Sequence, residues 1–72
     1  MGISATIGDR AAMLVGEVSI KIINQFRIYG LAPQQQQDSN GILRREIAIP
    51  LRNPEQKQAF RVACSNLHIA IN

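Results

Sequence analysis

The chain has 72 residues, of which 46% are hydrophobic, and carries a net charge of +3. This composition argues against disorder along the whole chain and fits one small domain, residues 1–72. A single cysteine excludes an intrachain disulfide, and one Cys with one His argues against a closed zinc site. Hydrophobic cores of this size often need additional stabilisation by disulfides, a metal ion or oligomerisation. Of these three, oligomerisation remains for this chain. We therefore expect an α+β homodimer or higher oligomer.

The first predicted element is a helix over about residues 8–29. Its start is marked by Thr6 and Asp9, and its end by Gly30, because glycine can take the left-handed turn that closes a helix. Leu31 can fold back on the last turn, and a proline follows shortly after. The apolar side of this helix follows a 3.6-residue period: Ala11, Val15, Val18, Ile22, Phe26 and Tyr29. Gly16 falls inside this helix and suggests the close approach of another backbone. Residues 18–22 also alternate like a strand, but the wider stripe favours a helix.

Residues 31–41 form the next predicted segment. They contain four consecutive glutamines, Gln34 to Gln37, and then a polar run that ends in Asn40-Gly41, a common turn sequence. We expect this segment to be an exposed and mobile loop.

The second half of the chain predicts a strand over about 42–51 and a helix over 54–71. Leu43, Ile47, Ile49 and Leu51 share one face of the strand. Asn53 then suits the helix cap and Pro54 suits the first helical position.

The apolar pattern predicts an interface with another molecule. A single strand leaves its backbone groups unpaired, and pairing with the same strand of a second subunit would complete it. The second helix also carries apolar residues opposite its main apolar face. The residues expected at this partner or oligomer interface are Ile47, Ile49, Leu51, Val62 and Ile69. The sequence thus favours a non-catalytic protein-binding or assembly module.

A small basic DNA- or RNA-binding regulator is the alternative function. The basic residues are biased towards the second half of the chain, and Arg44, Arg45 and Arg52 of the 42–53 region are the candidate nucleic-acid contacts. The stretch from Arg44 to Leu51, followed by an Asn-capped helix, resembles the opening of a ribbon-helix-helix DNA-binding domain. This resemblance implies a two-stranded ribbon across a dimer, with Arg44, Glu46 and Ala48 facing the bases. The chain ends at Asn72, before the second helix of that family.

Catalytic chemistry has little support in the sequence. Cys64 and His68 are four residues apart on the predicted helix, and such a pair can form an activated thiolate. Cys64, however, lies on the apolar face, which favours a structural role. We expect no enzyme, no cofactor and no metal site. The chain also lacks an apolar run long enough to span a membrane, and we expect a cytoplasmic location.

Overall fold

The computed structural model describes residues 2–34 and 46–72, which form four strands and two helices. In chain order these are β1 (Ser4–Ile7), β2 (Ala11–Val15), α1 (Ile20–Ile28), β3 (Glu46–Pro50), α2 (Pro54–Leu67) and β4 (Ala70–Ile71). The predicted α+β class is confirmed. The predicted order of helix, loop, strand and helix is wrong, because two strands precede α1 and a short strand follows α2.

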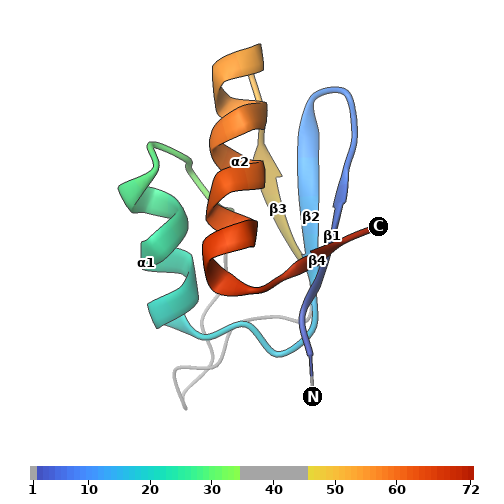
Figure 1. The fold of residues 1–72 in the computed structure, drawn as a ribbon, viewed down its shortest axis with the longest axis vertical. Coiled ribbons are helices and arrows are strands. Elements are labelled where there is room, and N and C mark those ends of the chain that lie inside the picture. Colours follow the sequence, from blue (N-terminus) through green and yellow to red (C-terminus); the bar gives the residue numbers. More distant parts are fainter. Residues whose placement is uncertain (1, 35–45) are drawn as a thin grey trace.

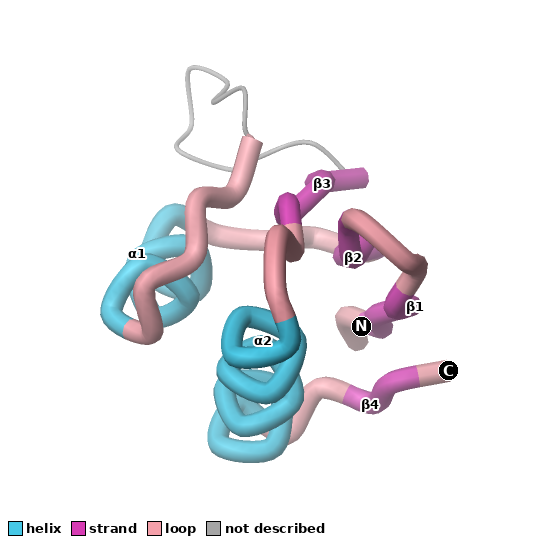
Figure 2. The backbone as a smooth tube through the Cα atoms, turned by 90° about the horizontal axis from the view of Figure 1, so that it is seen from above, coloured by secondary structure: helices cyan, strands magenta, loops and turns pink. Residues whose placement is uncertain are grey.

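The four strands form one mixed sheet in the order β3-β2-β1-β4. The β1–β2 and β2–β3 pairs are antiparallel, whereas β4 runs parallel to β1. Both helices lie on the same side of this sheet, as Figure 1 and the perpendicular view in Figure 2 show. The described part of the chain is therefore a two-layer structure whose sheet has one covered face and one open face.

The N-terminal part of the predicted helix 8–29 is instead the second half of a β-hairpin. The N–H of Gly8 donates to the carbonyl of Ala11 at 2.8 Å and closes the turn between β1 and β2. The buried residues Ala12 and Leu14 alternate with the more exposed Ala11, Met13 and Val15, which is the period of a strand. The helical stripe was misleading because Ala11 and Val15 also fit a 3.6-residue spacing.

Gly16 turns the chain out of β2 and allows it to pass close to the N-terminal segment. Its φ is +136°, and a Cβ added there would lie 2.6 Å from the carbonyl oxygen of Gly2 and 3.0 Å from Cα of Ile3. The predicted close approach of another backbone is confirmed, although Gly16 is not in a helix.

The helix α1 has clear signals at both ends. Ser19 caps its start, where Oγ accepts a hydrogen bond from the N–H of Ile22 at 3.3 Å. At its end, Gly30 has a φ of +82°, and the N–H of Leu31 donates to the carbonyl of Phe26 at 3.2 Å. Together with the bond from Gly30 to Arg27, this completes a Schellman motif. The predicted helix end is thus confirmed.

Residues 31–34, which follow α1, lie against the rest of the fold. Leu31 and Pro33 are buried, and the N–H of Gln34 donates to the carbonyl of Ala48 at 2.8 Å. Residues 31–34 therefore differ from the exposed loop that we expected for 31–41, because they lie against β3. The predictions for residues 35–41, and for 42–45 of the strand, fall outside the described residues.

The helix α2 begins where the sequence predicts and ends earlier. Asn53 Oδ1 accepts from the N–H of Gln56 at 2.8 Å, and Pro54 is the first helical residue. The predicted end at residue 71 is wrong, because His68 adopts a left-handed conformation with φ 58°. The N–H of Ile69 then donates to the carbonyl of Cys64 at 2.8 Å, and the chain leaves the helix to form β4.

The core lies between the covered face of the sheet and the two helices. Phe26 of α1 stacks on Phe60 of α2 with ring centroids 5.4 Å apart, and both rings are fully buried. Asn66 of α2 also donates a hydrogen bond to the hydroxyl of Tyr29. The sheet contributes Ala5, Ala12, Leu14, Ile47 and Ile49 to the same core cluster. No helix within the described ranges has the length and apolar character needed to cross a membrane.

Candidate functional site

Four of the five residues predicted at the interface lie in the core of the chain itself. Ile47 and Ile49 are fully buried, Leu51 is 2% exposed and Ile69 is 8% exposed. Their apolar side chains are covered within the chain, where they belong to its own core cluster. Val62 is different, because 40% of its surface is exposed on α2.

The strand partner of β3 is also found within the chain, where β2 pairs with it in antiparallel register. The outer edge of β3 is poorly suited to further pairing, because the carbonyl of Ala48 already accepts from Gln34 and Pro50 has no N–H to donate. The ribbon-helix-helix resemblance implies a two-stranded ribbon across a dimer, whereas in this structure β3 has β2 of its own chain as its strand partner.

The open face of the sheet is the first candidate binding surface. Its side chains form three rows across the strands, because the register aligns the outward residues of neighbouring strands. The rows consist of Ala70, Ser4, Val15 and Glu46; of Thr6, Met13 and Ala48; and of Ala11 and Pro50. Val15 is 42% exposed, and Thr6 and Ala11 are also exposed.

This open face, defined by those nine residues, is unusual in its lack of charge. Open faces of antiparallel sheets are commonly polar, whereas here Glu46 is the single ionisable residue and stands at one end of a row. The described basic residues lie elsewhere: on the two helices, at the β1–β2 turn and in the connection between β3 and α2. A second surface could therefore cover this face without burying a basic side chain.

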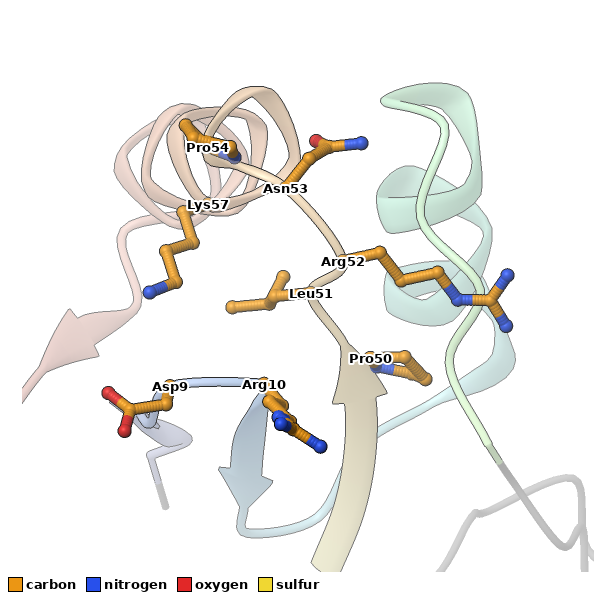
Figure 3. A pocket seen from close by; sticks show the side chains of 8 residues that line it. All are labelled: Asp9, Arg10, Pro50, Leu51, Arg52, Asn53, Pro54 and Lys57. Carbon is orange, nitrogen blue, oxygen red and sulfur yellow. The ribbon is translucent and has the colours of Figure 1, made fainter.

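The second candidate is a hollow of about 510 Å³ between the β1–β2 turn and the start of α2. Figure 3 shows the eight residues that line it, with Leu51 in the middle. They are Asp9, Arg10, Pro50, Leu51, Arg52, Asn53, Pro54 and Lys57. Three of the eight are basic and one is acidic, so the lining carries an excess of positive charge.

The charged groups surround the hollow on different sides. Lys57 extends from α2 towards the side occupied by Asp9, and Arg10 lies across the opening below Leu51 (Figure 3). Arg52 extends away from Leu51 towards the side of α1, so that it borders the hollow at its rim. Within the described residues, no side-chain hydrogen bond engages Arg10 or Lys57.

The predicted nucleic-acid contacts are only partly visible in this arrangement. Arg44 and Arg45 fall outside the described residues, and Arg52 lines the hollow. Sequence reasoning missed Arg10 and Lys57, because no local pattern joins the hairpin turn to a helix more than 40 positions away. The signal that could have helped is the turn sequence Gly8-Asp9, which favours a hairpin and places Arg10 at its tip.

Cys64 and His68 do not form a reactive pair. Cys64 is fully buried in the core, and this burial raises the pKa of its thiol from 9.0 to about 11. His68 is exposed and lies beyond the end of α2. The thiol is therefore protonated near neutral pH, which supports the structural role that its apolar position predicts.

We expect Cys64 to react slowly with thiol reagents in the folded protein and to make stability fall at high pH. Because the folded pKa is raised, the unfolded state loses its proton first as the pH passes about 9, and the free energy of unfolding decreases towards pH 11. The loss attributable to this thiol reaches about 2–3 kcal/mol. Urea denaturation of the natural chain and of Cys64→Ala, compared from pH 8 to pH 11, isolates this contribution. A pH-independent difference between them would contradict it.

No group of three or more His, Cys, Asp or Glu residues able to hold a metal ion is present in residues 2–34 and 46–72. Comparison with known proteins found no family model, no curated protein and no solved structure that matches this chain.

Proposed function

We propose that this protein is a non-catalytic assembly module that binds a second copy of itself through the open face of its sheet. The observation that carries this proposal is the near absence of charge across the nine residues of that face, in a chain of net charge +3. Two copies with the same positive charge can approach most easily where their basic residues are absent. The central row of Thr6, Met13 and Ala48 would then lie at the middle of the contact.

The mode of association differs from strand pairing. The outer edge of β3 is closed by Gln34 and Pro50, and the other edge strand, β4, has only two residues. The face of the sheet is open, so stacking of two sheets is favoured over extension of one sheet. Since each chain encloses its own core, the dimer is expected to form from folded monomers.

The area of the open face determines how strong self-association is expected to be. The width of the face follows from four strands that lie about 4.8 Å apart, and its length from a rise of about 3.3 Å per residue along the strands. Together they give an area on the order of 250 Å². Stable interfaces usually bury about 800 Å² per partner. We therefore expect a weak dimer whose population depends strongly on protein concentration.

A cytoplasmic location belongs to the same proposal. It is supported by the single cysteine, which is buried and unpaired, as is usual for proteins of reducing compartments. The raised pKa of this thiol supports the non-catalytic role, because a protonated and buried thiol is a poor nucleophile.

Sedimentation equilibrium tests the proposal with a charge placed in the central row. The natural chain should show an average mass that rises from 8.0 kDa towards twice that value with increasing concentration. Thr6→Lys should remain at the monomer mass, because two added charges would face each other across the contact. The matched control is Ile28→Lys on α1, where Ile28 is 73% exposed and off the sheet. Equal self-association of the Thr6 variant and the natural chain would contradict the proposal.

A further inference from the structure

We propose that the hollow between the β1–β2 turn and the start of α2 binds the phosphate groups of a nucleic-acid strand. Three cations border it from three segments of the chain: Arg10 from the turn, Lys57 from α2 and, at the rim with its side chain directed towards α1, Arg52 from the connection between β3 and α2. With Asp9 as the single acid, the lining has a net charge of +2. This surface is distinct from the open face of the sheet, so the proposal does not depend on self-association.

The backbone holds these segments together. The N–H of Leu51 donates to the carbonyl of Arg10 at 2.8 Å, which joins the hairpin turn to the residue before Arg52. The side chain of Gln56 accepts a hydrogen bond from the N–H of Arg52 at 2.6 Å. Because Gln56 directly precedes Lys57, this bond joins the Arg52 segment to the part of α2 that carries Lys57. The positions from which the three cations extend are therefore fixed by the fold before any ligand arrives, which lowers the entropic cost of binding.

The shape of the hollow favours an extended anion over a small enclosed one. Its middle is apolar, with Leu51 between Pro50 and Pro54. Arg10 and Lys57 flank this middle, and Arg52 stands at the rim with its side chain directed away from it (Figure 3). A nucleic-acid strand can cross such a surface with successive phosphates near different cations. The start of α2 adds little as an anion site, because the N–H of Gln56 is bonded to Asn53, Pro54 has no N–H, and Glu55 is acidic.

The composition of the lining also predicts how the strand is recognised. None of the eight lining residues is aromatic, so the hollow offers no ring on which a base could stack. Contacts to phosphate fix position and carry no sequence information. We therefore expect binding that depends on salt concentration and is indifferent to base sequence.

Fluorescence anisotropy with a labelled oligothymidine measures this binding. With three cations engaged, the association constant should fall about 20-fold between about 50 and about 200 mM salt. Arg10→Ala and Lys57→Ala should each weaken binding at low salt and reduce this fall to about 7-fold. An oligonucleotide of mixed sequence should bind with the same affinity as oligothymidine. Inorganic phosphate should compete only weakly, because it occupies one phosphate position.

The control is Lys21→Ala, which removes the same charge from the first turn of α1, at the opposite end of the molecule from the hollow (Figure 1). This variant should bind like the natural chain. All three side chains are partly or fully exposed, so circular dichroism should show unchanged folding. Absence of binding at low salt, an equal loss in the Lys21 variant, or a strong preference for one base sequence would each overturn the proposal.

Discussion

Replacement of Phe60 by alanine is expected to lower the free energy of unfolding by about 3–5 kcal/mol. The ring is fully buried and stacks on Phe26 at 5.4 Å, so the change removes the main aromatic contact between the two helices and leaves a cavity. A domain of this size is stabilised by only about 4–11 kcal/mol in total. The variant should therefore lose a large share of the total free energy of unfolding.

Urea denaturation followed by circular dichroism measures this loss. Val62→Ala is the matched control, because Val62 is on the same helix and 40% exposed. Its effect should be within about 1 kcal/mol of zero. A loss below about 1 kcal/mol for Phe60→Ala would show that the two helices do not pack through this ring.

Replacement of Gly16 by alanine is expected to cost about 3 kcal/mol or more. Two effects add here: a φ of +136° is strained for any residue with a side chain, and the new Cβ would lie 2.6 Å from the carbonyl oxygen of Gly2. Either the turn after β2 or the N-terminal segment would have to move, which would disturb the start of β1.

Gly30→Ala separates these two effects. Gly30 also has a positive φ, of +82°, but an added Cβ would meet nothing within 4 Å. Its replacement should cost about 1 kcal/mol, the value for left-handed strain alone. In thermal unfolding, the midpoint temperature of Gly16→Ala should therefore be clearly lower than that of Gly30→Ala. Equal losses would contradict the close passage of the chain at Gly16.

The sequence predicted those features that depend on local hydrogen bonding. Asn53 and Pro54 mark the start of α2, and Gly30 with Leu31 marks the end of α1, because caps use side chains and backbone groups within a few residues. The apolar alternation around Ile47 and Ile49 likewise identified β3. These signals do not depend on the rest of the fold.

The hairpin could not be separated from a helix by apolar spacing alone. Ala11, Val15 and Val18 fit a helical stripe, and the same segment offers Ala12 and Leu14 to a strand. The choice is made by tertiary structure, where Leu14 pairs across from Ile47 and both side chains enter the core. Once β2 exists, β3 has a partner within the chain, and the prediction that Ile47 and Ile49 reach a second subunit is no longer needed.

The two candidate surfaces could not be predicted from the sequence, because each joins residues that are far apart along the chain. The rows on the open face arise from the register of four strands, which joins Thr6, Met13 and Ala48 across more than 40 positions. The hollow similarly joins Arg10 to Lys57. Arg52 alone was identified from the sequence, through the basic character of its own segment.

The most direct test of assembly through the sheet is isotope-filtered nuclear magnetic resonance on a mixture of labelled and unlabelled chains at high concentration. We expect contacts between copies that involve the side chains of Thr6, Met13 and Ala48, the central row of the open face. Contacts between copies confined to the exposed apolar residues of the helices, such as Ile28 and Val62, would contradict the account. The absence of any contact between copies at high concentration would contradict it as well.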